Sequence, residues 1–245
     1  MCTVSWLQQD GGFQLLCNRD EKRTRVAAVA PAAEWIDGVR VLAPRDEQGG
    51  GAWVSVNEYG VAVTLLNGAN TGGGERAGVF SKSRGLVLQR LATARTASEV
   101  CDRAWRMDLG AVAPFTVAAL EPGLPAALIE WNGDAKKIVA RADQFRPLAS
   151  SSYDPAGVRT ARRREFARVC GLAPRVEDLL AFHRSHEGEG SSNGDAYSAC
   201  MHRADAETVS FSWIRVASTS ARFIYQPGAP CRLWSSVSTE LALRV

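Results

Sequence analysis

The sequence lacks the features that mark several large classes of protein. No apolar run approaches the roughly 20 residues of a membrane-spanning helix. The N-terminus shows no basic and then apolar leader, so we expect a cytoplasmic protein without a secretory signal. The formal charge of +3 is too small to indicate a nucleic acid partner. The six cysteines form no C-x-x-C pair, which argues against zinc ribbons and redox motifs.

The remaining composition is that of an ordinary globular protein. Hydrophobic residues make up 46% and charged residues 22% of the 245 positions, which is enough to build one well-buried domain over residues 1–245. Without a leader, we expect most cysteines to be reduced, buried residues. Cys200 and Cys231 would suit neighbouring strands, but we favour free thiols over a disulfide there.

The first 21 residues predict a β-hairpin. Thr3–Gln9 alternates β-branched, aromatic and polar residues, residues 10–12 are Asp-Gly-Gly, and Phe13–Cys17 forms the returning strand. For a loop of about two to four residues, the residue numbers of two positions that pair across the hairpin add up to roughly 21 to 23. Cys2 then faces one of three charged residues: Arg19, Asp20 or Glu21.

This pairing predicts a nucleophile at Cys2. If Met1 is removed, Cys2 carries an α-amine with a pKa near 7.7–8.0 beside a thiol with a pKa near 8.5, so one residue supplies nucleophile and base. Arg19 would favour the thiolate and Asp20 would hold the amine. The alternative is a cysteine without a role beside a solvated hairpin end, and the sequence leaves both open.

An ordered set of short motifs carries a family resemblance. The set is Met1-Cys2-Thr3, Asn18-Arg19-Asp20-Glu21, Leu42-Ala43-Pro44-Arg45-Asp46, Gly50-Gly51-Ala52-Trp53, Asn57-Glu58 and Leu65-Leu66-Asn67. The chain resembles the NRDE family, the transport-and-Golgi-organisation-2-like proteins. That family is similar to the cysteine branch of the N-terminal-nucleophile hydrolases, which contains choloylglycine hydrolase and penicillin V acylase. The resemblance implies hydrolysis of C–N bonds other than peptide bonds, although no agreed reaction defines the family.

The order of predicted elements indicates the fold class. Strands are followed by two helices (83–95 and 97–107), three strands, two helices (157–170 and 176–186) and closing strands. Two antiparallel sheets placed face to face with helices outside satisfy this order. The result is an α+β fold, the four-layer αββα sandwich that the resemblance also implies. We expect residues 22–33 to be irregular and the last strand to be Cys231–Trp234.

Asn67 is a second candidate for the active site. It ends an apolar predicted strand, and the resemblance implies that its carboxamide stabilises an oxyanion. Removal of such a donor costs roughly 3 kcal/mol of transition-state stabilisation. The alternative is a loop-initiating asparagine that bonds to its own backbone.

The rest of the predicted site comes from the resemblance alone. A second family asparagine is expected within residues 148–154, where this chain has Ser150, a shorter donor. This departure weakens the hydrolase interpretation. A distal arginine of the cysteine branch corresponds to Arg159 or Arg162, and Asn18 completes the predicted binding residues.

Metal and cofactor signals are weak, and we expect no cofactor and no metal. His183 and His186 would share a helix face, with His202 as a conceivable third ligand, but helix-end histidines are more often solvated. In Cys200-Met201-His202, alternate residues of a strand face opposite ways, so the three side chains cannot converge on one haem iron.

Two functions from different classes follow. The first is a cysteine amidohydrolase with Cys2, Arg19, Asp20 and Asn67 as catalytic residues. The second is a non-catalytic binding or trafficking protein for haem, a lipid or an acyl-CoA, because the family has been linked to such ligands. A cleft without a remaining function is a third possibility. We expect residues 67–81 and 187–195 to select the ligand. The identity of the ligand and the oligomeric state stay open.

Overall fold

The hairpin predicted at the start of the chain is present. Strand β1 (Cys2–Gln9) pairs with β2 (Gly12–Lys22) through a turn in which Gly11 adopts a φ of 71°. Cys2 lies opposite Arg19 in this pairing, so paired positions sum to 21. Strand β2 is buried on both faces over most of its length. Such burial is expected of a central strand that is covered on both sides.

The computed structural model describes residues 2–68, 80–186, 195–232 and 235–244. In this part of the chain the strands form two antiparallel sheets, one ordered β10-β1-β2-β11-β12-β13 and the other β3-β4-β5-β6-β7-β8-β9. The remaining strands of the first sheet are β10 (Leu148–Ala149), β11 (Ala206–Val216), β12 (Ser220–Pro227) and β13 (Val237–Ala242). Those of the second are β3 (Val29–Ile36), β4 (Val39–Arg45), β5 (Val54–Asn57), β6 (Ala62–Asn67), β7 (Phe115–Leu120), β8 (Ala127–Trp131) and β9 (Lys136–Val139).

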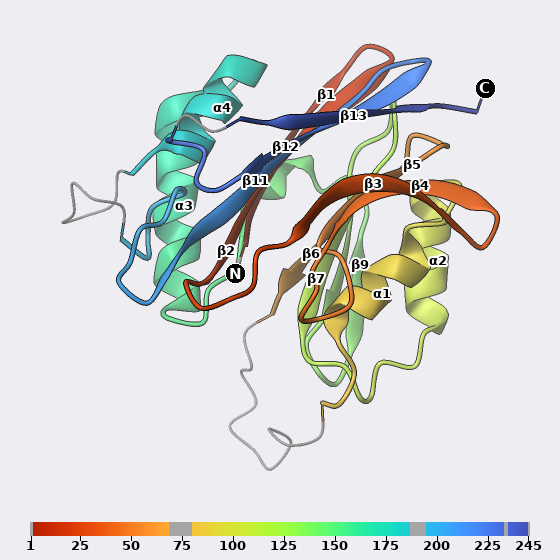
Figure 1. Cartoon of the computed structure of the whole chain (residues 1–245), viewed down its shortest axis with the longest axis horizontal. Helices are drawn as coiled ribbons and strands as arrows, with labels where there is room; N and C mark the ends of the chain where they lie inside the picture. The colour runs from red at the N-terminus through yellow and green to blue at the C-terminus, as the bar shows by residue number, and fades with distance from the viewer. Residues whose placement is uncertain (1, 69–79, 187–194, 233–234, 245) are drawn as a thin grey trace.

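Helices cover the outer faces of both sheets. The four are α1 (Arg84–Leu91), α2 (Ala97–Arg106), α3 (Pro155–Cys170) and α4 (Val176–Arg184), and a short 3-10 helix η2 (Asp143–Phe145) precedes β10. Figure 1 shows α3 and α4 on one side of the molecule and α1 and α2 on the other, with the sheets between them. The predicted αββα sandwich is therefore confirmed.

Side-chain caps fix where two of the helices begin. The Thr96 hydroxyl accepts a hydrogen bond from the Glu99 N–H at 3.0 Å and starts α2. The Asp154 carboxylate accepts one from the Gly157 N–H at 3.0 Å and starts α3, with Pro155 in the first turn. Each cap satisfies a backbone donor that has no partner within its helix.

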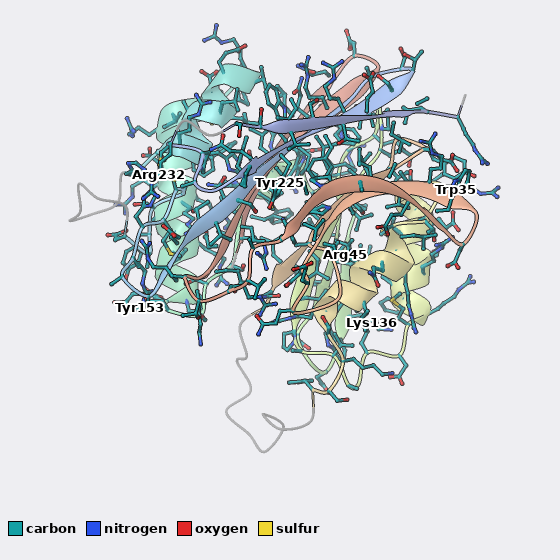
Figure 2. The ribbon with its side chains drawn as sticks, in the orientation of Figure 1. Trp35, Arg45, Lys136, Tyr153, Tyr225 and Arg232 are labelled. Carbon is teal, nitrogen blue, oxygen red and sulfur yellow. The ribbon has the colours of Figure 1, made fainter. Side chains whose placement is uncertain are left out.

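Three apolar clusters hold the layers together. The cluster between the sheets includes Val4 and Trp6 from the hairpin and Tyr225 from β12, which Figure 2 labels near the middle of the molecule. A second cluster packs the β3–β9 sheet against α1 and α2, and a third packs β2 and β11 against α3 and α4. The two faces of one strand therefore serve different layers, as the two-residue period of a strand requires.

Three predictions about the chain need correction or stay untested. Residues 29–33 of the stretch expected to be irregular belong to β3 (Val29–Ile36), an edge strand that pairs with β4 through the Asp37-Gly38 turn. Cys231 and Arg232 lie in a turn, and the last strand is β13 instead. Most of residues 67–81 and 187–195, the two loops predicted to select the ligand, lies outside the described residues. Within the described chain, every helix is too short or too polar to cross a membrane.

Substitution of Gly12 is expected to loosen the junction of β2 and β11. A Cβ at Gly12 would lie 1.9 Å from the Val216 carbonyl oxygen, so the backbone must shift. We expect Gly12→Ala to lower the free energy of unfolding by about 1–3 kcal/mol, measured by urea denaturation. Gly110→Ala is the control, because its Cβ would meet a single side-chain atom at 3.4 Å. Equal stability of the two variants would contradict this account.

Candidate active site

Cys2 lies at the start of β1 and lines a cavity of about 400 Å³. The Cys2 side chain is buried. Cys2 pairs with Arg19 across the hairpin, and Cys17 lies two positions from Arg19 along β2, so Cys17 is on the same face of the sheet as Cys2. A hydrogen bond from Cys17 lowers the pKa of the Cys2 thiol, while burial raises it; the net direction is downward. The same hydrogen bond raises the pKa of Cys17 well above its usual value. Cys17 therefore stays a thiol, and Cys2 is the residue favoured as thiolate.

Arg19 is held beside Cys2 by partners on three sides. Its guanidinium is 3.1 Å from Asp46 and 3.8 Å from Glu21, and lies 4.5 Å from the centre of the Trp53 ring. The positive charge of Arg19 contributes to the lowered pKa of the Cys2 thiol. Ion pairing on one side and ring stacking on the other fix the planar guanidinium in place.

Asp46 connects Arg19 to a second arginine. Burial alone would raise the pKa of the Asp46 carboxyl, but hydrogen bonds from Arg25 and the Gly49 N–H, together with the charge of Arg19, lower it. Asp46 is thus ionised at neutral pH and balances two guanidinium groups. Sequence analysis placed Asp46 in the family motif without a role, because nothing local to residue 46 indicates which arginines it meets.

Part of the cavity wall is cationic. Arg84 is the first residue of α1 and Lys82 lies two residues before it, and both line the same space as Cys2. The Arg84 guanidinium donates to the Pro114 carbonyl at 3.2 Å. Burial lowers its pKa, and the negative charges of Glu21 and ionised Cys2 oppose that shift. An acidic or strongly polar group of a ligand would therefore be favoured at this wall.

Asn67 lies where two cavities meet. It ends β6 and lines both the Cys2 cavity and a smaller one of about 210 Å³. Among the described residues, none forms a hydrogen bond with the Asn67 carboxamide. The loop backbone to which a loop-initiating asparagine would bond lies in residues 69–79, outside the described part of the chain, so both roles of Asn67 stay predictions.

Ser150 contacts the backbone of Cys2 directly. The Cys2 nitrogen donates to Ser150 Oγ at 3.0 Å, and the Ser150 N–H donates to the Cys2 carbonyl at 3.0 Å. Ser150 also lines the smaller cavity together with Asn67 and Arg159. The serine that departs from the family pattern is therefore positioned to orient the Cys2 nitrogen.

Asp20 lies on the opposite face of β2 from Cys2 and Arg19. Its carboxylate accepts hydrogen bonds from Thr208 Oγ1 at 2.7 Å and from Arg162 Nη1 at 3.2 Å. Arg162 is buried as well, and it also donates to Thr3 Oγ1 and to the Ala196 carbonyl. Removing one partner of a buried ion pair leaves the other charge uncompensated. Of the two arginine candidates, Arg162 thus joins Asp20, whereas Arg159 is exposed and lines the smaller cavity.

Two sequence predictions do not match the geometry. Asn18 is fully buried and lines neither cavity, because its amide donates to the His183 and Ala199 carbonyls. His183, expected to be solvated at a helix end, is fully buried: its ring contacts Ser5 Oγ at 2.8 Å and Asn18 Oδ1 at 3.0 Å. Burial lowers the pKa of His183 to about 3, so the ring is neutral. Both side chains fasten α4 to the sheet.

The fold and the sequence place the chain among known proteins. Two facing antiparallel sheets lie between helical layers, and a penicillin V acylase and a conjugated bile acid hydrolase share this fold. Residues 1–154 match the family model described as Transport and Golgi organisation 2. The match spans more than half of the sequence, and the chain belongs to this family. A search of curated proteins finds no match.

Solved structures with the same fold include three hydrolases. Penicillin V acylase from Agrobacterium tumefaciens aligns with a TM-score of 0.58 and 10% identity over 97% of this chain and 85% of its own. The Caenorhabditis elegans ortholog of N-acylethanolamine-hydrolyzing acid amidase aligns with a TM-score of 0.58 and 12% identity over 94% of each chain. A mutant conjugated bile acid hydrolase from Clostridium perfringens aligns with a TM-score of 0.56 and 12% identity over 98% of this chain and 92% of its own. At these identities the likeness establishes the fold.

Removal of the Cys17 donor is expected to make Cys2 less reactive. The Cys17→Ala substitution deletes the hydrogen bond that lowers the pKa of the Cys2 thiol, so less thiolate is present at neutral pH. The pH profile of Cys2 alkylation by iodoacetamide, followed by peptide mass mapping, should shift to higher pH. Cys17→Ser keeps a donor and should shift the profile less. An unchanged profile in Cys17→Ala would contradict the assignment.

Proposed function

We propose that this protein is a cysteine amidohydrolase that cleaves a C–N bond, other than a peptide bond, in a small acyl amide. The observation that carries the proposal is the convergence on one cavity of a thiol with a lowered pKa, a fixed guanidinium and a carboxamide. These groups belong to Cys2, Arg19 and Asn67. The same fold in an acylase, an acid amidase and a bile acid hydrolase supports the choice of reaction class.

The reaction follows from the positions of these groups. In a chain whose first residue is Cys2, the α-amine accepts the thiol proton and Cys2 Sγ attacks the acyl carbon. The negative charge that develops on the carbonyl oxygen is stabilised by the Asn67 carboxamide and a backbone N–H. Collapse breaks the C–N bond, and the leaving amine takes the proton from the Cys2 α-ammonium. Water then attacks the thioester, releases the acid and restores the thiol.

Ser150 and Asp20 have supporting roles in this proposal. Ser150 Oγ lies 3.0 Å from the Cys2 nitrogen and fixes the direction of its lone pair. The Asp20 carboxylate is held by Arg162 and Thr208 on the other face of the hairpin, but its negative charge acts on Cys2 and so favours the ammonium that forms during the reaction. Arg19 keeps the thiolate populated. Binding of the ligand by Arg159 in the smaller cavity belongs to the same proposal.

A non-catalytic binding function is the second candidate, and the cationic cavity wall favours it. Arg25, Lys82 and Arg84 outnumber the carboxylates Glu21 and Asp46 in the lining, which suits a ligand that carries phosphate or carboxylate groups. A long-chain acyl thioester of coenzyme A is such a ligand. Saturable binding with a defined stoichiometry, in a protein without turnover of any acyl amide, would select this candidate.

The N-terminal residue decides whether the self-contained base exists. We expect the intact mass of the protein purified from its native host to correspond to a chain that lacks Met1. One cysteine should alkylate much faster than the other five at neutral pH, and peptide mapping should place it at Cys2. If Met1 is retained, the α-amine lies one residue too far from the thiol and the binding function leads.

The Cys2→Ala substitution is expected to abolish hydrolysis of N-acyl amides that carry chromogenic amine leaving groups. The reason is that, among the described residues lining the cavity, Cys2 alone carries a thiol. Cys101→Ala is a matched control, since this half-buried cysteine lies on α2, away from the cavity lining. Thermal unfolding of both variants checks the fold. Turnover that persists in Cys2→Ala would overturn the mechanism.

Asn67→Ala is expected to lower kcat by roughly 10²–10³-fold, as loss of an oxyanion donor does elsewhere. KM should change little, because the amide acts on the charge that develops in the transition state. The measurement is steady-state kinetics on the substrate found in the amide screen. A raised KM with unchanged kcat would instead assign Asn67 to ligand binding.

A further inference from the structure

Four metal-ligand side chains meet at a place that the proposed function does not use. They are His186, Cys200, His202 and Cys231, and one donor atom from each lies within 4.8 Å of all the others. The cysteines are free thiols. Cys200 is fully buried, and the other three residues are partly buried. Two imidazoles and two thiols are a common ligand set for a closed tetrahedral zinc site.

The distances suit one small cation. His202 Nε2 lies 3.5 Å from Cys200 Sγ and 3.1 Å from Cys231 Sγ. With Zn–S near 2.3 Å and Zn–N near 2.0–2.1 Å, a tetrahedral site separates sulfur and nitrogen ligands by roughly 3.5–3.6 Å. The rings of His186 and His202 are in edge contact, 5.0 Å between centroids. His186 Nε2 is buried and has no hydrogen-bond partner in the described structure.

Glu207 supplies an outer partner for one of the histidines. Its Oε2 atom lies 3.9 Å from His202 Nδ1, and both atoms are buried without a hydrogen bond in the described structure. A metal on Nε2 requires the proton of the ring to be on Nδ1, where it can be donated to this carboxylate. Carboxylate–histidine–zinc arrangements of this kind fix the tautomer and orient the ring.

The backbone around the cluster is already held in place. The Cys200 N–H donates to the Ser185 carbonyl at 3.0 Å, and Ser198 Oγ donates to the His186 carbonyl at 2.7 Å. Gln226 Nε2 donates to the Ala229 carbonyl at 2.8 Å and so braces the turn that carries Cys231. Figure 2 labels the next residue, Arg232, at the end of the molecule formed by α3 and α4. Preorganised ligands of this kind favour metal binding.

We propose that His186, Cys200, His202 and Cys231 bind a structural zinc ion. The four protein donors complete a tetrahedral shell and leave no position for a substrate, so the site is structural and not catalytic. A bound zinc ion would contradict the expectation, drawn from the sequence, that the protein binds no metal. It would join the end of α4, the segment before β11 and the connection between β12 and β13.

The zinc ion would also support the buried pair beneath Cys2. Met201, between two of the ligands, donates its N–H to Thr208 Oγ1 at 2.9 Å, and Thr208 donates to Asp20. The Ala196 carbonyl, from the same segment, accepts from Arg162. Fixing residues 195–202 therefore fixes the partners of Asp20 and Arg162. Zinc binding by itself does not depend on whether Cys2 is catalytic.

The test is the zinc content of the full-length protein, reconstituted with zinc under reducing conditions and measured by mass spectrometry. We expect about one zinc per chain in the wild type and a loss of bound zinc in Cys231→Ser and His186→Gln. The matched control Cys170→Ser, a cysteine at the end of α3 outside the cluster, should keep its zinc. EDTA should lower the Tm of the wild type and the control and leave that of Cys231→Ser unchanged.

Two further measurements do not depend on variants that may misfold. Cobalt(II) in place of zinc in the wild type should give sulfur-to-cobalt charge-transfer bands and the visible spectrum of tetrahedral cobalt. Glu207→Gln, which removes no ligand, should weaken zinc affinity by roughly 10–100-fold in competition with a chromophoric chelator, while Glu240→Gln should not. An octahedral cobalt spectrum, unchanged zinc content in Cys231→Ser, or a native Cys200–Cys231 disulfide would each overturn the proposal.

Discussion

The register of β1 against β2 is the constraint on which the rest of the structure depends. Because the side-chain period of a strand is two, a slip of one residue would exchange every inward and outward side chain of the hairpin. The observed register places Cys2 and Arg19 toward the cavity and the inter-sheet core. It places Asn18 and Asp20 toward α3 and α4. Both the candidate chemistry and its support therefore follow from one pairing.

The polar groups beneath the hairpin divide into two systems with different energetics. On the cavity side, Arg19 is balanced by Asp46 and Glu21 at a partly open surface, where each ion pair contributes little alone. On the helix side, Asp20 and Arg162 are both desolvated, so each depends on the other and on hydrogen bonds from neighbours. The first system can respond to a ligand, whereas the second holds the scaffold rigid.

The fold could be predicted from the sequence, and the limits of that prediction have physical causes. Alternating strands, helix periodicity and the Asp-Gly-Gly turn are local signals that predicted the hairpin and the layers, but they left Arg19, Asp20 and Glu21 open as the residue opposite Cys2, which is Arg19. The first part of β3, residues 29–33, was expected to be irregular, because an edge strand needs little hydrophobic patterning. The cluster around Cys200 joins residues scattered from 186 to 231, which no spacing rule connects. The roles of Asp46 and Arg84 depend on neighbours that are distant in the sequence: Asp46 pairs with Arg19, and Arg84 lines the cavity with Cys2.

The two-residue strand β10 has a consequence for how copies of this chain meet. A β1 strand with an open outer edge would present unpaired amides and carbonyls as a template for another molecule. Pairing with Leu148 and Ala149, and donation by Arg146 to the Trp6 carbonyl, satisfy part of that edge within the same chain. The segment 146–150 thus protects the edge of the hairpin from intermolecular strand addition and amyloid-like aggregation. The Cys2 thiol, at the first residue of β1, still faces the cavity.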